Sequence, residues 1–364
     1  MSKEDFPLAH AGMASEIKLQ KKYYEDGRIY IIQIESTLKC PQLCSYCYAG
    51  SLPDSPEGLT SDKIRSLLNS AAKMGVRMID WLGGDPLVRK DWYELCKYAS
   101  NLGLINNIWT SGIPLANPEV ARKAVEVSYK GFISTHLDTL DSDLYKLMHG
   151  GKQYEGNLNN IDLILNGIKN IMQAGKDPGA IVNCITYTTP LANGDSKAMI
   201  SYFQEKFGIK TCLTLFNPVI HRTVNPLWEP NNDQIKDAYE HRDRTNYPND
   251  PSCGPMDVSK FYCGTVVCVT TEGWLVPCSV IRTKEFGNVH DEKLEFLVEK
   301  TRQRLLMLDF RDTSKLPGNC GSCSNSSNCF GCRSSAFYYN GDIMAEDPKC
   351  FQFSEKVLNK AMEE

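Results

Sequence analysis

The sequence lacks the features that mark a membrane protein, a secreted protein or a nucleic-acid-binding protein. It has no run of the roughly 20 apolar residues that a helix needs to cross a bilayer, and its first residues contain no apolar core of signal-peptide length. Its net charge is -4, from 40 Lys and Arg against 44 Asp and Glu, so no excess of one sign favours nucleic acid or an anionic membrane. We therefore expect a cytoplasmic protein that binds neither.

Cysteine, in contrast, is abundant, with 15 residues in a chain of 364. Because no secretion signal is evident, so many cysteines indicate metal ligands rather than disulfides, and an odd number leaves at least one thiol outside any all-disulfide scheme. Three of them, Cys40, Cys44 and Cys47, form a tight group directly after an apolar run at 29–34. Nine more fall within residues 253–350, so a cysteine-poor middle is followed by a metal-rich end.

The first cysteine group is one ligand short of a closed metal site. Structural zinc sites and ordinary iron-sulfur sites take four protein ligands, so three adjacent thiols suggest an iron-sulfur cluster with one iron open to a small molecule. Spacing alone leaves two alternatives, which are a loop of ordinary cysteines and a zinc site completed elsewhere in the chain.

The segment Cys40-Pro-Gln-Leu-Cys44-Ser-Tyr-Cys47 resembles the CxxxCxxC signature of the radical S-adenosylmethionine (AdoMet) superfamily. In that family the three thiolates bind a 4Fe-4S cluster, and AdoMet chelates the fourth iron. The resemblance implies that Tyr46 lies against the adenine of AdoMet.

A second segment, Trp81-Leu-Gly83-Gly84-Asp85-Pro86, resembles the Gly-Gly-Glu-Pro turn that holds the methionine amino group in the same family. Asp85 is one methylene shorter than the usual Glu, and we expect the backbone of the turn to serve in its place. The resemblance also implies AdoMet contacts for Ser134, and for His149 where relatives often have an Arg for the cofactor carboxylate. The alternative for each of these two is an ordinary polar residue at the mouth of a barrel.

Short apolar runs alternate with longer helical patterns from Ile29 to Phe216. The predicted strands are 29–35, 77–82, 105–109, 131–135, 181–187 and 212–216, and the predicted helices are 61–74, 91–100, 118–127, 159–174 and 196–207. This alternation implies a parallel sheet, and six such units match the partial (βα)6 barrel, similar to a TIM barrel, of the radical AdoMet family. Both motifs follow predicted strands, at the end where parallel barrels carry their reactive groups. Weaker candidates at the strand ends are Thr110-Ser111-Gly112, His136, Asp138 and Asn183.

The C-terminal cysteines closely resemble the SPASM extension of radical AdoMet enzymes, which houses two auxiliary 4Fe-4S clusters. The resemblance assigns Cys263, Cys268, Cys278 and Cys332 to the first cluster, and Cys320, Cys323, Cys329 and Cys350 to the second. Cys329 and Cys332 are separated by two residues where the founding pattern has three. The alternative is a zinc-ribbon pair built from Cys320 with Cys323 and Cys329 with Cys332.

The expected organisation has four parts. Residues 1–28 form a polar lead-in, 29–216 the barrel, 217–262 a proline-rich linker with a helix near 233–243, and 263–364 the SPASM domain. Cys253, in the linker, is a candidate hydrogen-atom donor or cluster ligand. No general acid or base is assigned.

The resemblance implies an oxidoreductase or maturase that works anaerobically. It would cleave AdoMet to a 5'-deoxyadenosyl radical, remove a hydrogen atom from its substrate and use the auxiliary clusters to complete an oxidation, with flavodoxin or ferredoxin as the reducing partner. A peptide or protein is the expected substrate, although the 39 residues before Cys40 are too few for a fused peptide-recognition domain. The alternatives are oxidative decarboxylation or side-chain modification of a tetrapyrrole such as a haem precursor, and dehydrogenation of a small alcohol, sugar or amino acid. A tetrapyrrole would need a broad cavity lined by Arg and His.

Overall fold

The computed structural model describes residues 8–10, 13–15, 17–150, 159–216, 226–246 and 259–351. Its main sheet has eight strands in the order β10-β9-β3-β4-β5-β6-β7-β8. Six consecutive parallel strands form the barrel wall: β3 (Ile31–Thr37), β4 (Met78–Gly83), β5 (Ile105–Trp109), β6 (Ile133–His136), β7 (Ile181–Tyr187) and β8 (Lys210–Leu215). The prediction of a partial parallel barrel is therefore confirmed, and most strand ends lie within two residues of the predicted ones.

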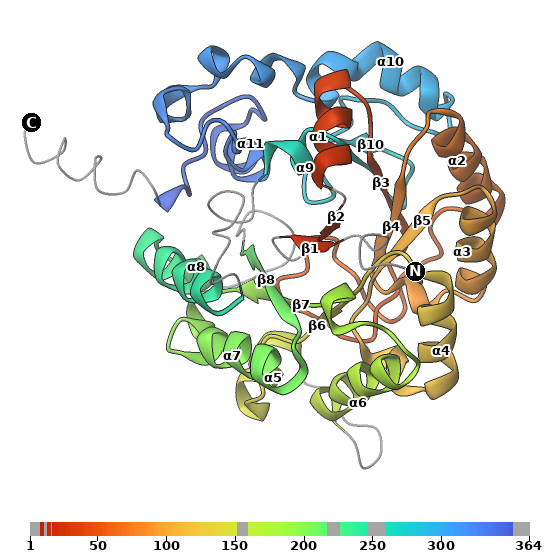
Figure 1. The fold of residues 1–364 in the computed structure, drawn as a ribbon, viewed down its shortest axis with the longest axis vertical. Helices are drawn as coiled ribbons and strands as arrows, with labels where there is room; N and C mark the ends of the chain where they lie inside the picture. Colours follow the sequence, from red (N-terminus) through yellow and green to blue (C-terminus); the bar gives the residue numbers. More distant parts are fainter. Residues whose placement is uncertain are drawn as a thin grey trace, which may run out of the picture.

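Helices surround the strands, as Figure 1 shows. The barrel helices are α2 (Ser61–Lys73), α3 (Trp92–Asn101), α4 (Pro118–Val127), α5 (Ser142–His149), α6 (Asn160–Gln173), α7 (Asp195–Phe207) and α8 (Asn232–Asn246). In α2 the apolar positions Ile64, Leu67 and Leu68 are buried against the sheet, and Thr60 caps the helix by accepting a hydrogen bond from the Lys63 N–H at 3.2 Å. Helix α5 was not predicted, because its eight residues give little room for a periodic apolar pattern.

The sheet extends beyond the six predicted strands. β9 (Val266–Val269) pairs in parallel with β3, with Ile31 opposite Val266, and β10 (Leu275–Val276) pairs antiparallel with β9. The C-terminal region thus begins inside the barrel sheet, and the sheet runs across the expected domain boundary at residue 263.

Of the N-terminal elements, α1 (Ile17–Asp26) packs against the C-terminal region. β1 (Leu8–His10) and β2 (Met13–Ser15) form a hairpin, and α1 follows it. The ring of Tyr24 on α1 meets that of Phe261 on α9 (Lys260–Cys263) edge to face at 5.3 Å. Arg302 and Arg311 donate to the carbonyls of Gly27 and Glu25, so C-terminal cations stabilise the C-terminal end of α1.

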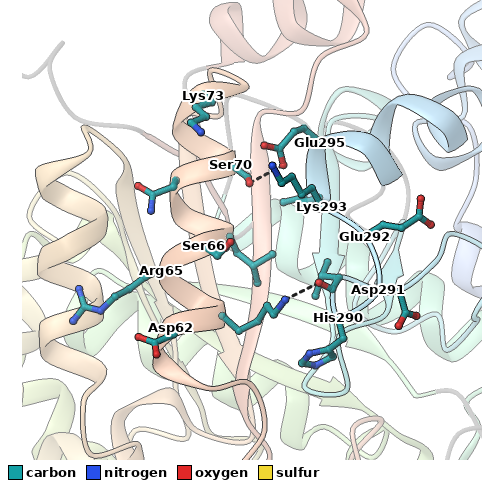
Figure 2. Close-up of a pocket in the computed structure, with 15 residues that line it drawn as sticks. Asp62, Arg65, Ser66, Ser70, Lys73, His290, Asp291, Glu292, Lys293 and Glu295 are labelled. Atoms are coloured by element: carbon teal, nitrogen blue, oxygen red, sulfur yellow. Dashed lines mark hydrogen bonds between the residues drawn. The ribbon is translucent and has the colours of Figure 1, made fainter.

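The C-terminal region has little regular structure. It contains α10 (Leu294–Leu305), α11 (Arg333–Asn340) and the short 3-10 helices η8 (Leu308–Arg311), η9 (Thr313–Lys315) and η10 (Gly318–Ser322). Figure 2 shows the groove of about 710 Å³ where the segment leading into α10 faces α2. There Ser70 donates to Glu295 at 2.7 Å, and Lys63 donates to the Val289 carbonyl at 2.8 Å.

The predicted linker contains η6 (Pro226–Trp228) and α8, and Cys253 lies outside the described residues. None of the helices in the described ranges is long and apolar enough to span a membrane.

Candidate active site

A cavity of about 420 Å³ lies between the barrel and the C-terminal region, at the C-terminal ends of the strands. Gly83, Thr110, His136 and Thr186 line it from successive strand ends. Six predicted metal ligands also line it, namely Cys40, Cys44, Cys47, Cys263, Cys278 and Cys332. No predicted ligand lines the groove beside α2. The cavity at the strand ends is therefore the candidate active site.

The loop after β3 carries the first cysteine group. Its start is fixed by a hydrogen bond from the Cys40 N–H to the Leu52 carbonyl at 3.1 Å, and Leu43 turns it with a positive φ of 53°. The Ser51 N–H lies 3.4 Å from the Cys47 sulfur, a contact that stabilises a thiolate. Burial, with the charge of Asp85, raises the pKa of Cys40, and burial raises that of Cys44. These two thiols keep their protons until a metal displaces them.

The glycine turn after β4 is clamped onto the base of this loop. The Gly84 N–H donates to the Thr37 carbonyl at 2.6 Å, and the Asp85 N–H donates to the Lys39 carbonyl at 2.7 Å. A Cβ on Gly83 would overlap the Thr37 carbonyl, and one on Gly84 would overlap the Lys39 carbonyl. Only two glycines allow the strands to approach this closely.

The Asp85 side chain is committed to the protein. It is fully buried and accepts hydrogen bonds from Leu87 N–H at 3.0 Å, Thr110 Oγ1 at 2.7 Å, Ser111 N–H at 2.9 Å and Ser111 Oγ at 2.6 Å. Pro86 follows at the start of η2 (Pro86–Val88). A carboxylate with four internal donors shapes the turn, which leaves the backbone of the turn as the part available to a ligand.

Tyr46 joins a buried polar network beside the cysteine loop. Its hydroxyl donates to Asp138 Oδ2 and lies 2.9 Å from His136 Nε2, and His149 Nε2 lies 3.0 Å from the same carboxylate oxygen. Asp138 Oδ1 also accepts the Thr186 N–H at 2.8 Å. Burial alone would raise the pKa of Asp138, but His136 and His149 hold it below its usual range. Asp138, a weak candidate in the sequence, is the centre of this network.

Ser134 and His149, the two single-residue candidates for AdoMet contacts, lie in different surroundings. Ser134 lines the cavity, with Oγ 3.3 Å from the Cys184 sulfur. His149 is fully buried, stacks on the Tyr145 ring at 4.1 Å and does not line the cavity. Its Nδ1 has no hydrogen-bond partner among the described residues. Both roles stay predictions.

Arg89 was not identified from the sequence. It is 7% exposed, and one guanidinium nitrogen donates to the carbonyls of Ser36 and Leu59, each at 2.8 Å. These carbonyls flank the cysteine loop at its two ends, so Arg89 holds the loop closed. No local motif marks such a residue, because its partners lie 30 and 53 positions away.

The four cysteines assigned to the first auxiliary cluster, here called the first C-terminal group, come from four separate elements. Cys263 ends α9, Cys268 lies in β9, Cys278 follows β10, and Cys332 precedes α11. Cys268 is fully buried, whereas the other three line the cavity.

The four cysteines assigned to the second cluster, the second group, do not line the cavity. Cys320 packs in a cluster with Met307, Phe310, Leu316 and Phe330. N–H groups face two of its sulfurs, from Asn325 to Cys323 at 3.4 Å and from Gly331 to Cys329 at 3.2 Å. Cys350 is also buried, at 8% exposure.

In the described part of the chain no three His, Cys, Asp or Glu side chains are arranged to hold one metal ion. Zinc binds each thiolate at about 2.3 Å, whereas the ligands of a four-iron cluster stand further apart. The Ser51 hydroxyl, which is buried beside Cys47 without a partner in the described residues, would meet the edge of such a cluster.

Comparison with known proteins agrees with this geometry. Residues 34–172 match the family model of the Radical SAM superfamily. The AdoMet-dependent heme synthase of Methanosarcina barkeri is 23% identical over 355 residues, covering 88% of this chain and 95% of the relative. The PqqA peptide cyclase of Xanthomonas axonopodis pv. citri is 25% identical over 342 residues, covering 88% and 87%. The structure of native anSMEcpe with bound AdoMet and Cp18Cys peptide has a TM-score of 0.64 at 13% identity, covering 92% of this chain and 98% of that one.

The comparisons support an enzyme of the radical AdoMet class, with AdoMet and a 4Fe-4S cluster as its cofactors. Residues 34–172 are similar to the Radical SAM superfamily, and the cysteine-rich end of the chain fits the SPASM-type enzymes among its structural neighbours. The resemblance predicted from the cysteine motif is confirmed for these residues.

Proposed function

We propose that this radical SAM enzyme removes a hydrogen atom from a peptide or protein and completes an oxidative modification with two auxiliary clusters. The observation that carries the proposal is that one cavity is lined by cysteines of the loop after β3 and by cysteines of the first C-terminal group. A substrate in this cavity lies beside both groups. The proposed radical-forming cluster and the proposed electron-accepting cluster would thus both lie next to the same substrate molecule.

The proposed cofactor contacts are those expected from the family. They are Cys40, Cys44 and Cys47 for the radical-forming cluster, the turn Gly83-Gly84-Asp85-Pro86 for the methionine part of AdoMet, Tyr46 for the adenine, and Ser134 and His149 for the remaining polar groups. When bound, AdoMet and the reduced cluster supply a 5'-deoxyadenosyl radical that takes a hydrogen atom from the substrate. Asp85 contributes by holding the turn in place through Thr110 and Ser111.

The walls of the cavity suit radical chemistry. Leu82, Trp109, Leu215, Phe216 and Met307 line it with apolar groups. Apolar walls exclude water and confine a reactive species to the bond that faces it. The barrel at 29–216 and the SPASM domain at 263–364 would each supply one side, with 217–262 connecting them.

The cations of the cavity favour a peptide over a tetrapyrrole. Among the described lining residues the side chains able to carry positive charge are His136, Arg333 and Lys349, and each has a protein partner. His136 contacts Asp138, Lys349 pairs with Glu229, and Arg333 donates to backbone carbonyls. A haem precursor would bring several carboxylates to a site where His136 and Lys349 already contact acidic side chains and Arg333 is only 3% exposed. The relatives include a peptide cyclase, and the solved structure of anSMEcpe contains a peptide.

Tetrapyrrole oxidation is the second candidate, because the heme synthase of M. barkeri is matched over 95% of its length. For either substrate we propose flavodoxin or ferredoxin as the electron donor and the cytoplasm as the location.

The first test is metal content with AdoMet turnover. The protein is purified and reconstituted without oxygen, its iron, sulfide and zinc are measured, and 5'-deoxyadenosine is quantified with dithionite as reductant. About twelve irons per chain, as three four-iron clusters require, together with AdoMet cleavage support the proposal. About four irons with bound zinc overturn the auxiliary clusters, and a fully loaded protein that leaves AdoMet intact overturns the activity.

The second test separates the substrates. The loaded enzyme is incubated with a peptide fraction or with a tetrapyrrole carboxylate, and the products are analysed by mass spectrometry. Loss of two hydrogens from a peptide supports the proposal, and loss of carbon dioxide from the tetrapyrrole overturns it. Cys332→Ala is expected to keep AdoMet cleavage but lose peptide oxidation. Cys96→Ala, in the buried face of α3, serves as the matched control.

A further inference from the structure

Arg333 is a buried cation between the two C-terminal cysteine groups. It is 3% exposed and follows Cys332, a predicted ligand of the first auxiliary cluster. A methyl group placed on Gly331 would lie 2.6 Å from Arg333 Nη2 and 3.5 Å from the sulfur of Cys320, a predicted ligand of the second. The guanidinium nitrogen and that sulfur therefore border the same space beside Gly331.

The guanidinium is held firmly in this position. Its Nε donates to the Gly331 carbonyl at 3.1 Å, and Nη1 donates to the carbonyls of Ile343 at 3.1 Å and Ala345 at 2.7 Å. The rings of Phe310 and Phe330 lie 5.0 and 5.7 Å from its centre. These contacts leave little freedom to rotate away from the sulfurs.

One nitrogen of the group is left over. Arg333 Nη2 is buried and has no hydrogen-bond partner within the described residues. An unpaired N–H of a buried cation is costly unless an anionic group faces it. An iron-sulfur cluster on Cys320 and Cys329 would be such a group, because a four-thiolate 4Fe-4S cluster carries net negative charge.

Asp347, a neighbour of opposite sign, lies against both groups. It is 5% exposed, its Oδ2 accepts a hydrogen bond from the Cys332 N–H at 2.7 Å, and its backbone N–H donates to Cys320. A carboxylate beside a cluster disfavours adding an electron to it, and a cation favours it. Because Asp347 borders both groups, Arg333, whose unpaired N–H faces the second group, is the charge that distinguishes them.

We propose that Arg333 makes the second auxiliary cluster easier to reduce than the first, so that an electron taken from the substrate moves from the first cluster to the second. This inference rests on the proposed function, since it requires both clusters. After losing a hydrogen atom the substrate gives up one more electron and one proton to complete a two-electron oxidation. That electron passes through the first cluster to the second and leaves to an oxidised one-electron carrier of the flavodoxin or ferredoxin type.

The test measures reduction potentials in the reconstituted holoenzyme by electron paramagnetic resonance. Cys323→Ser identifies the signal of the second cluster. In Arg333→Met the equilibrium constant for transfer from the first cluster to the second is expected to fall about tenfold or more, which is about 59 mV for one electron. Arg333→Lys keeps the positive charge and is expected to retain most of the difference. Arg122→Met removes a charge from the outer surface of α4, where the side chain is 56% exposed, and should change nothing.

Unchanged potentials in a fully iron-loaded Arg333→Met protein overturn the inference. So does an Arg333→Lys protein shifted as far as Arg333→Met, because that result assigns Arg333 a packing role independent of charge. A wild-type protein without two auxiliary clusters fails earlier, at the iron count, and overturns the proposed function together with the inference.

Discussion

The barrel and the C-terminal region are stabilised by different interactions. The barrel strands carry fully buried apolar side chains such as Ile32, Ile79 and Ile181, packed under amphipathic helices. In the C-terminal region short 3-10 helices replace long elements, and Cys320, Cys329 and Cys350 are among its buried residues. Hydrophobic burial stabilises the barrel and also α10, where Leu297 and Leu305 are fully buried. Residues 313–351 contain only short helices, and we expect them to depend also on the proposed metal ligands.

Of the predicted effects, metal removal should give the largest difference in stability between the two regions. We expect that stripping the iron with a chelator increases amide hydrogen exchange roughly hundredfold or more in residues 313–351, because metal binding there is folding free energy. Amides of β4 to β7 are expected to change less than roughly threefold. Hydrogen-exchange mass spectrometry of the loaded and stripped protein measures both, and equal loss of protection in the two regions would contradict the comparison.

The same contrast explains how far the sequence could predict the fold. Apart from α5, the barrel strands and helices were predicted closely, because apolar residues recur in them at intervals that can be read from the sequence. β9 and β10 were missed, since strands of four and two residues carry no pattern and their pairing depends on contact with β3.

The site divides along the same line. Spacing pointed to the first cysteine group, and resemblance to the radical AdoMet family identified the glycine turn and the C-terminal ligands. The structure brings six of these cysteines and both glycines to one cavity. The sequence did not identify Arg89 or Arg333 and offered Asp138 only as a weak candidate, because each acts through contacts that only the folded chain creates. Resemblance also assigned Asp85 by position, but its carboxylate is occupied by Leu87, Thr110 and Ser111.

Gly83→Ala tests the close packing on the barrel side. A Cβ there would overlap the Thr37 carbonyl, and Gly83 has a φ of 130°, so we expect a loss of about 3 to 5 kcal/mol in unfolding free energy. AdoMet binding by the loaded protein should weaken along with it. Gly103→Ala is the control, because its φ is 81° but nothing lies within 4 Å of the new Cβ, so backbone strain alone costs about 1 kcal/mol. Urea unfolding followed by circular dichroism compares them, and similar losses would show that the close contact is unimportant.

Glu35→Gln tests the connection between the two regions. Glu35, on β3, is buried and forms a bidentate pair with Arg282 of the C-terminal region at 2.6 and 2.9 Å. Removing the charge leaves a largely buried guanidinium without its partner, so we expect destabilisation of about 2 to 3 kcal/mol by urea unfolding. The control is Glu57→Gln, whose pair with Lys39 is on the surface and should contribute under about 0.5 kcal/mol. If both variants lose the same stability, the buried pair does not join the regions.

The smallest expected effect is the pH dependence of stability caused by Lys176, a buried lysine of the barrel. Its side chain is 5% exposed and donates to the carbonyls of Ser128 at 2.5 Å and Gly131 at 2.7 Å, and burial lowers its pKa to about 7. An unfolded lysine titrates near about 10.4, so from pH 7 to 10 the unfolded chain binds more protons than the folded one. Stability should therefore rise with pH in this window, by at most about 1.4 kcal/mol per pH unit, and the cost of burying the charge is full below pH 7.

Urea unfolding of the wild type and Lys176→Met between pH 7 and 9 measures this slope. The wild type is expected to gain stability relative to the variant as pH rises, because only the wild type sheds the buried charge, whereas Lys169→Met, on the exposed face of α6, should run parallel to the wild type. Parallel curves for Lys176→Met would mean that the lysine stays charged on its carbonyl partners. At each pH, the wild type and Lys176→Met should show the same hydrogen-exchange protection in residues 313–351, because Lys176 contacts only barrel residues, Ser128 and Gly131, through these hydrogen bonds.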